Sequence, residues 1–461
     1  MKWARIIEKT FKALLPSPFT IAIALTIVTF ALAFFLTPAR NGYANHFFDI
    51  ADYWQRGLWT DGLLVFAFQM MLMLVLGHAL ALTKMVDRVI VSATQFCNST
   101  ANAALIVTLL TVLVSLFNWG LGLIFGAILV RKVGENARKN RIQLNYPLIG
   151  AAGYSGLMVW HGGISGSAPI KAADEGHIHA LMSGVVPEEQ LSRFPESVSY
   201  AETIFGGMNL TAMTLVIVVL PLFMYLIGRR TQKSSMLPER SEARVSEGKA
   251  TGAERLDASN ILAVIIGGLM LSYAIMLAVK GYKSSGWSFI NPNFINLTLL
   301  GMGLTFHGSV RSFLRGVNEA ITGSAGILIQ FPLYFGIMGI MNGSGLVQIF
   351  STFLADVSSE TTFPLYTFLS AGVVNVFVPS GGGQWVAQGP IILKAASDIG
   401  VSFPKAIMAL SYGDQLTNML QPFWALPLLG ITGLKAREIL PYSVALMGVG
   451  IVLFVLVLLI F

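Results

Sequence analysis

Two polar, glycine-rich stretches interrupt otherwise apolar segments of membrane length, and they limit what the chain can fold into. The first is Trp160-His161-Gly162-Gly163-Ile164-Ser165-Gly166-Ser167, and the second is Pro379-Ser380-Gly381-Gly382-Gly383-Gln384. Unsatisfied backbone N–H and C=O groups are costly in hydrocarbon, so non-helical backbone at membrane depth must be buried in protein or line a watery cavity. The sequence therefore predicts membrane helices with two protected breaks.

The two halves of the chain carry related residues at a constant offset of 257, the spacing from Asn118 to Asn375. The same offset pairs Gly126 with Gly383, Pro147 with Pro404, Gly156 with Gly413 and His161 with Asn418. A duplicated chain with a broken segment in each half indicates a substrate site near the bilayer midplane.

The composition excludes a soluble protein. Of the 461 residues 54% are hydrophobic and 11% are charged, and the mean hydropathy is +0.69, so the chain predicts several bilayer crossings. The net charge of +7 does not indicate nucleic acid, because Lys and Arg gather in the loops of one side. The single cysteine, Cys97, excludes an internal disulfide. The basic N-terminus and the apolar run 19–36 predict a retained first span rather than a cleaved signal peptide.

The distribution of basic residues predicts the topology. Spans are expected at 19–36, 63–82, 203–227, 261–279, 294–306, 321–341 and 442–461. The interrupted regions 85–131 and 344–397 are expected to be re-entrant hairpins. With that assignment 22 of the 30 Lys and Arg residues share the side of the N-terminus, which predicts a cytoplasmic N-terminus and an external C-terminus. The first hairpin then faces the cytoplasm and the second the exterior.

The predicted fold is an all-α polytopic membrane protein, an inverted structural repeat with two re-entrant helical hairpins and two broken transmembrane helices. Residues 1–228 form the first repeat, with its broken helix at 144–170. Residues 229–256 are polar and lack apolar periodicity, which predicts a flexible cytoplasmic linker. Residues 257–461 contain an extra span and the second repeat, with its broken helix at 403–431.

The breaks carry the residues expected to bind substrate. Three consecutive glycines let a ligand approach the backbone, and a helix that resumes at about Gln384 directs free N–H groups at a carboxylate. A tight turn that needs glycine only for its conformation is the alternative. The predicted substrate-binding set is Asn118, Trp119, Gly120, His161, Gly162, Gly163, Ser165, Ser167, Asn375, Ser380, Gly381, Gly382, Gly383, Gln384, Thr417 and Asn418.

The ionisable residues at the breaks are expected to couple transport to a cation. Asp414 and His161 are costly at membrane depth and either could take up a proton. A neutral structural histidine and a helix-capping carboxylate are the alternatives. Asn118 and Asn375, at the matching hairpin tips, complete the predicted coupling-ion set, and each could instead fasten its own tip.

The motif inventory favours a carrier over an enzyme or a channel. The sequence contains no HExxH, GxSxG or P-loop spacing. Two inverted, non-identical breaks differ from the symmetric pore-lining rings of a channel. We expect no cofactor and no bound metal beyond a coupling ion, H⁺ or Na⁺.

The residues around both breaks resemble a known family. Val378-Pro379-Ser380-Gly381-Gly382-Gly383-Gln384-Trp385, followed by Gln388-Gly389-Pro390, and Trp160 to Ser167, followed by Ala168-Pro169, resemble the bacterial short-chain fatty acid transporter family. That family is similar to the wider ion transporter superfamily, whose members pair two hairpins with two unwound helices and often work as dimers. The Ser-Asn-Thr triplet of the superfamily is absent here; Ile164-Ser165-Gly166 and Leu416-Thr417-Asn418 stand in its place, which leaves sodium coupling open.

The resemblance implies cation-driven uptake of short monocarboxylates such as butyrate or acetoacetate across the bacterial cytoplasmic membrane. The expected partners are a small carboxylate, the lipid bilayer and a second copy of the chain in a homodimer; nucleic acid is not among them. A carrier for another organic anion, such as a dicarboxylate, and a passive anion channel are the alternatives. The lack of arginine in both breaks argues against a dicarboxylate.

Overall fold

The structure, a computed structural model, describes residues 18–39, 42–231, 252, 254–285, 289–377 and 381–461. In those residues all regular secondary structure is helical, as the predicted fold class requires. Of the helices in this described part of the chain, five are long and apolar enough to cross a membrane: α4 (Asp61–Ala81), α6 (Thr100–Phe117), α11 (Gly207–Arg230), α13 (Asn260–Ser285) and α22 (Ala436–Ile460). A shorter apolar helix, α2 (Pro18–Leu36), covers the predicted first span.

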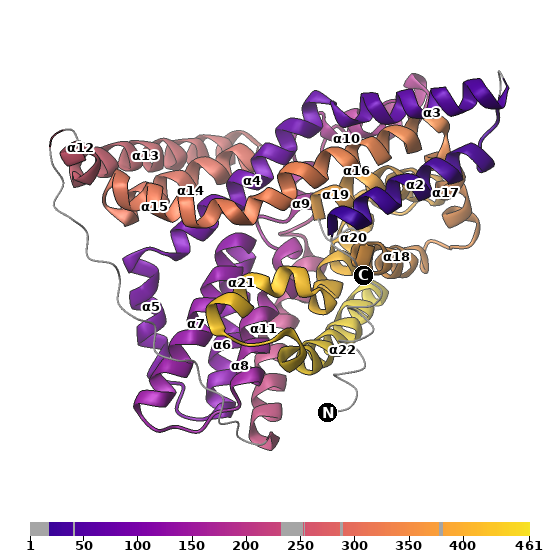
Figure 1. Ribbon diagram of the computed structural model, residues 1–461. Helices are drawn as coiled ribbons and strands as arrows, with labels where there is room; N and C mark the ends of the chain where they lie inside the picture. The colour runs from indigo at the N-terminus through magenta and orange to yellow at the C-terminus, as the bar shows by residue number, and fades with distance from the viewer. Residues whose placement is uncertain (1–17, 40–41, 232–251, 253, 286–288, 378–380) are drawn as a thin grey trace.

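The helices form two groups that meet along α4 (Figure 1). One group holds α2, α13 and the following elements: α3 (Tyr43–Leu58), α12 (Glu254–Ala258), α14 (Pro292–His307), α15 (Val310–Ala320), η5 (Ile321–Ser324), α16 (Ala325–Ser344) and α17 (Leu346–Asp356). Here α3 packs on α16 and α14 packs on both α13 and α4. Helix α3 occupies a stretch where the sequence predicted no span. Gly57, Gly336 and Gly339 allow its backbone to approach that of α16 closely.

The other group contains both hairpins and both broken helices. The first repeat supplies α5 (Lys84–Thr94), α6, α7 (Trp119–Lys139), α8 (Tyr146–Tyr154), η1 (Ser155–Met158), η2 (Trp160–Gly162) and α9 (Ser167–Ala172). The second supplies α18 (Phe363–Phe377), α19 (Gly381–Ile399), α20 (Phe403–Thr417), η6 (Asn418–Leu420) and α21 (Pro422–Thr432). In each repeat an antiparallel helix pair is followed by a helix that stops short, passes through one or two 3₁₀ turns and resumes as a short helix.

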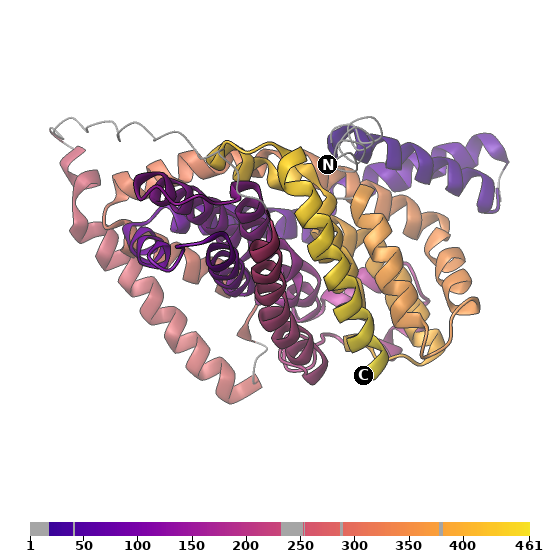
Figure 2. The same ribbon diagram turned by 90° about the horizontal axis from the view of Figure 1, so that it is seen from below.

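The elements between and after the repeats enclose this second group. Helices α11 and α22 lie side by side along it (Figure 2). The segment between α9 and α11 contains two short elements, α10 (His177–Met182) and η3 (Glu188–Arg193). Most of the predicted linker 229–256 and all of residues 1–17 lie outside the described residues.

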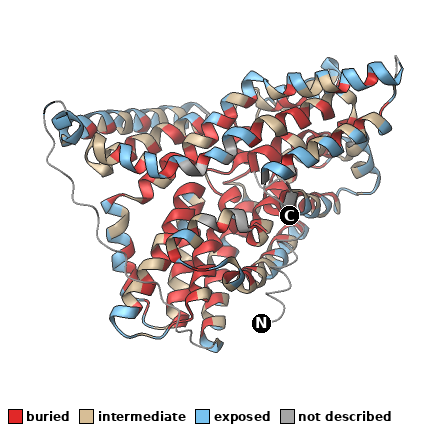
Figure 3. Ribbon diagram, viewed as in Figure 1, coloured by how far each residue is buried: buried red, intermediate tan, exposed pale blue. Residues whose placement is uncertain are grey.

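The buried residues lie mainly in the group that contains the hairpins and broken helices. The hairpins and breaks are mostly buried, whereas exposed residues concentrate on the outer helices (Figure 3). Large apolar side chains are exposed along α11 and α13, including Leu222, Leu226, Ile265, Leu269 and Ile275. Apolar surface of this extent matches contact with lipid rather than with water. The breaks therefore lie in the protein interior, where an irregular backbone is tolerated.

Candidate functional site

Asn118 forms the tip of the first hairpin. It has an extended backbone (φ −151°, ψ 126°) between α6 and α7, and its Oδ1 accepts a hydrogen bond of 2.8 Å from the N–H of Leu121. This is an N-cap, which satisfies one of the free N–H groups at the start of α7. Of the two roles considered for Asn118, the structure therefore shows tip fastening by Oδ1. Its Nδ2 is buried and has no partner among the described residues.

The hairpin tip is bound to the first break through the backbone. Ser165 Oγ accepts from the N–H of Trp119 at 3.0 Å, and the N–H of Ile164 donates to Leu116 O at 2.8 Å. A Cβ on Gly163 would overlap the backbone of Leu116, so glycine is needed here for close approach. On the other side of the tip a Cβ on Gly120 would lie 3.1 Å from the backbone of α4.

The two breaks are bound to each other. Gln415 Oε1, from α20, accepts from the N–H groups of His161 (3.0 Å) and Gly162 (3.1 Å). In the opposite direction, the hydroxyl of Tyr154, at the end of α8, lies 2.8 Å from the carbonyl oxygens of both Asn418 and Gln421. Backbone groups that each break leaves unpaired are therefore satisfied by side chains of the other repeat.

His161 and Asp414 meet in the protein interior. Both side chains are buried, and His161 Nδ1 lies 3.6 Å from Asp414 Oδ1, just beyond hydrogen-bond range. His161 Nε2 accepts a hydrogen bond of 2.9 Å from the N–H of Ala168. Because a backbone N–H can only donate, this bond assigns the imidazole proton to Nδ1, which faces the carboxylate. Neither oxygen of Asp414 has a hydrogen-bond partner in the described part of the chain, so Asp414 does not act as a helix cap.

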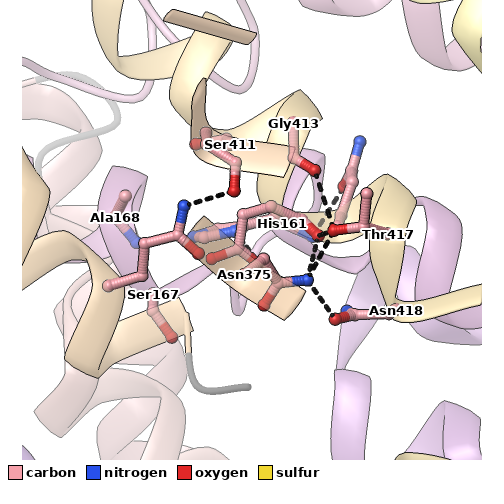
Figure 4. Close-up of polar contacts among 12 residues, drawn as sticks. His161, Ser167, Ala168, Asn375, Ser411, Gly413, Thr417 and Asn418 are labelled. Carbon is pink, nitrogen blue, oxygen red and sulfur yellow. Dashed lines mark hydrogen bonds and ion pairs between the residues drawn. The ribbon is translucent and has the colours of Figure 1, made fainter. Parts of the chain in front are cut away.

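Asn375, the symmetry counterpart of Asn118, makes different contacts. Its Nδ2 lies 2.6 Å from Asp414 O, 2.9 Å from Thr417 Oγ1 and 2.8 Å from Asn418 Oδ1 (Figure 4). Gln421 Nε2 donates to the carbonyl oxygen of Asn375. Equivalent positions in the two repeats have therefore diverged: one asparagine caps its own hairpin, and the other binds the neighbouring broken helix.

The glycine triplet lies within a helix. Helix α19 is described from Gly381, three residues before the predicted restart at Gln384, while Pro379 and Ser380 lie outside the described residues. A Cβ on Gly381 would lie 2.6 Å from the ring of Trp160, one on Gly382 2.7 Å from that of Phe66, and one on Gly383 2.6 Å from that of Tyr334. These glycines thus let the first turn of α19 pack against aromatic rings.

The remaining predicted residues border this centre. Gln384 Nε2 donates to Ala371 O at 2.9 Å and fastens α19 to α18. Ser167 begins α9, and its hydroxyl lies 3.7 Å from the sulfur of Met70 on α4.

Two polar contacts beside the site were not predicted. Lys171, on α9, is buried, pairs with Asp174 at 2.8 Å and lies 5.4 Å from the ring centre of Phe66. His177, in the segment between α9 and α11, accepts a hydrogen bond of 3.0 Å from the indole of Trp385 on α19. Burial, and secondarily the charge of Lys171, lowers the pKa of His177 from 6.5 to about 3. Sequence spacing could not reveal either contact, because both depend on how α9 and α10 pack.

Comparison with solved structures agrees with this fold. The chain is similar to the Alcanivorax borkumensis YdaH transporter, with a TM-score of 0.53, 16% identity and coverage of 95% of this chain and 98% of that one. It is also similar to Neisseria gonorrhoeae MtrF, described with a class of antimetabolite efflux pumps, with a TM-score of 0.55, 13% identity and coverage of 98% and 97%. At these identities the likeness establishes the fold alone.

Comparison of sequences establishes the family. An Escherichia coli K12 protein named "Putative short-chain fatty acid transporter" is 34% identical over 459 residues, covering 98% of each chain. A Haemophilus influenzae protein of the same name is 34% identical over 436 residues, covering 93% of this chain and 92% of its own. The family model described as "Short chain fatty acid transporter" matches residues 2–461. The chain is an integral membrane protein that belongs to the short-chain fatty acid transporter family.

Proposed function

We propose that the protein is a secondary active transporter that imports short monocarboxylates, such as butyrate or acetoacetate, together with a proton or a sodium ion. Membership of the family supports the substrate class. Cation coupling rests on one observation: Asp414 is buried, and neither of its carboxylate oxygens has a hydrogen-bond partner among the described residues. A buried carboxylate without partners is costly in its charged form, and binding of a cation removes that cost.

The pairing of Asp414 with His161 supports a link between the cation and the substrate. The two residues come from different repeats, and their side chains approach to 3.6 Å. A cation bound at Asp414 would lie next to an anion bound beside His161, and each would favour the other electrostatically. Without the cation, the substrate anion would lie close to the negative carboxylate of Asp414 and be repelled by it, which is the energetic basis of symport.

The proposed orientation follows from the loops. The excess of Lys and Arg on the side of the N-terminus supports a cytoplasmic N-terminus in the bacterial inner membrane. Alternating access would then expose the His161–Asp414 centre to each side in turn.

Uptake into proteoliposomes tests the proposal. Labelled butyrate and acetoacetate are offered under an imposed proton gradient in one set and a sodium gradient in another. Accumulation that follows one gradient identifies the coupling ion, whereas equilibration without accumulation would indicate a facilitator or a passive channel. Competition by an excess of a dicarboxylate such as succinate would establish the alternative substrate class.

Two substitutions test the location of the site. Asp414→Asn and His161→Ala are expected to abolish gradient-driven accumulation. Asp87→Asn is the matched control, because Asp87 is a surface carboxylate on α5, 3.6 Å from Lys132, and should leave accumulation unchanged. Normal accumulation by both site variants would show that the centre lies elsewhere.

A further inference from the structure

The unpaired polar groups of the two repeats differ in kind. In the hairpin and broken helix of the first repeat, from α6 to α9, the buried groups other than hydroxyls that have no partner among the described residues are Asn118 Nδ2, Trp119 Nε1, Trp160 Nε1 and His161 Nδ1. In the hairpin and broken helix of the second repeat, from α18 to α21, they are Asn375 Oδ1, Gln384 Oε1, both oxygens of Asp414, Gln421 Oε1 and, as the exception, Gln415 Nε2. Hydroxyls are left aside because they can either donate or accept. In these elements the first repeat thus presents donors, and the second presents mainly acceptors.

These assignments do not depend on the choice between two amide orientations. Asn118 Oδ1 and Gln415 Oε1 face backbone N–H groups, and Gln384 Nε2 and Gln421 Nε2 face backbone carbonyls. Asn375 Nδ2 likewise faces the carbonyl of Asp414. Each backbone partner has one possible role, so it fixes which end of the amide points away from it.

The donors of the first repeat lie close together. The ring centres of Trp119 and Trp160 are 5.8 Å apart, and Trp160 stacks on His161 at 4.3 Å with an angle of 10° between the rings. Trp119 and Trp160 are each only 6% exposed. The six-membered ring of Trp160, at Cη2 and Cζ2, packs on Gly381 at the start of α19. The donor cluster adjoins the acceptor cluster where His161 faces Asp414.

A carboxylate complements these donors. An indole N–H can only donate, and an ionised carboxylate can only accept, at about four lone-pair positions. Burying a donor without an acceptor is unfavourable, so a bound carboxylate would remove a cost that the folded chain otherwise bears. Uncharged donors suit an anion of single charge. The indole rings of Trp119 and Trp424, packed edge to face with their centres 5.5 Å apart, provide apolar surface for a short tail.

We propose that the substrate carboxylate binds to the first repeat through the indole N–H groups of Trp119 and Trp160. The acceptors of the second repeat are left for the cation. This inference rests on the proposed function and makes it more specific, because it assigns the carboxylate to indole N–H groups instead of the backbone N–H groups at the glycine triplet. The sequence had favoured the triplet, but its three positions pack against aromatic rings.

Tryptophan-to-phenylalanine variants test the proposal, because phenylalanine keeps an aromatic ring and removes the N–H. In full-length protein in proteoliposomes, Trp119→Phe and Trp160→Phe should each raise the KM for butyrate by about 10- to 100-fold. Trp54→Phe is the matched control. The indole N–H of Trp54 also lacks a partner in the described chain, but Trp54 lies on α3, which contributes no residue to the site. An unchanged KM in both site variants would overturn the proposal.

Spectroscopy of the wild-type protein removes the dependence on how the variants fold. With ¹⁵N-labelled indoles in nanodiscs, butyrate should shift the Nε1–H signals of Trp119 and Trp160, while an equal concentration of chloride should not. If butyrate accumulates in proteoliposomes but leaves both signals in place, the indole assignment is wrong and the proposed function stands. If wild-type protein neither binds nor accumulates butyrate, the proposed function itself fails.

Discussion

Gln415→Met tests the connection between the two breaks. Gln415 Oε1 is the acceptor for two buried backbone N–H groups, those of His161 and Gly162. Methionine has a similar length and shape, but its thioether is a weak acceptor. Each N–H left without an acceptor costs about 1–3 kcal/mol, so the variant should lose about 2–6 kcal/mol in free energy of unfolding if both bonds are lost.

Two measurements should report this loss. Unfolding in mixed detergent micelles gives the change in stability, and hydrogen–deuterium exchange with fragmentation should show faster exchange at His161 and Gly162. Gln415→Glu retains acceptor oxygens and should keep exchange at these amides slow. Gln143→Met, at an exposed position between α7 and α8, is the control and should stay within about 0.5 kcal/mol of wild type.

A small effect would refute the reasoning. If Gln415→Met matches the Gln143→Met control in stability, and the amides of His161 and Gly162 exchange as slowly as in wild type, then Gln415 is not their acceptor.

Three further predictions concern the surroundings of the site. Gly163→Ala should weaken butyrate uptake, because its Cβ would displace the tip of the first hairpin. Gly448→Ala on α22, which has open space around it, should instead raise the free energy of unfolding by about 0.5–1 kcal/mol. Measuring uptake and unfolding for both variants separates the two effects. Because the pKa of His177 is lowered from 6.5 to about 3, the folded state binds fewer protons than the unfolded state between these values. The contribution of the neutral His177 side chain to the free energy of unfolding should therefore be complete above pH 6.5 and should fall by about 2 kcal/mol by pH 5. The His177→Gln variant should show a shallower pH dependence of unfolding. Tyr154→Phe removes the hydroxyl shared by two carbonyls of the second break and should cost about 1 kcal/mol of unfolding free energy, measured against wild type in the same micelles.

The fold was largely predictable because its signals are local. Apolar runs identified the long helices, and a polar residue inside such a run located the hairpin tip at Asn118, where α6 ends and α7 begins. Helix α3 was not predicted, because it contains few consecutive apolar residues and packs through the glycines of α16. The glycine triplet was expected to be non-helical on grounds of propensity; its packing against Phe66 and Tyr334, on α4 and α16, explains why the helix includes it.

The sequence located the polar residues of the two breaks, but it did not predict their hydrogen bonds. The offset of 257 residues paired Asn118 with Asn375, yet their side chains have different partners. Gln415 binds two amides of the other repeat, and no spacing along the chain indicates that contact. Duplication preserves the positions of polar residues, whereas the direction of each hydrogen bond depends on packing between segments about 250 residues apart.

The packing of the glycine triplet also has an evolutionary consequence. The three positions at the start of α19 and the rings of Trp160, Phe66 and Tyr334 share a fixed volume. A homologue with alanine at one of these positions would need a smaller partner ring, so we expect each glycine–ring pair to change together. The three pairs each join α19 to a different element. Correlated substitutions at these pairs in an alignment of homologues would therefore identify the packing of the second hairpin against the rest of the protein.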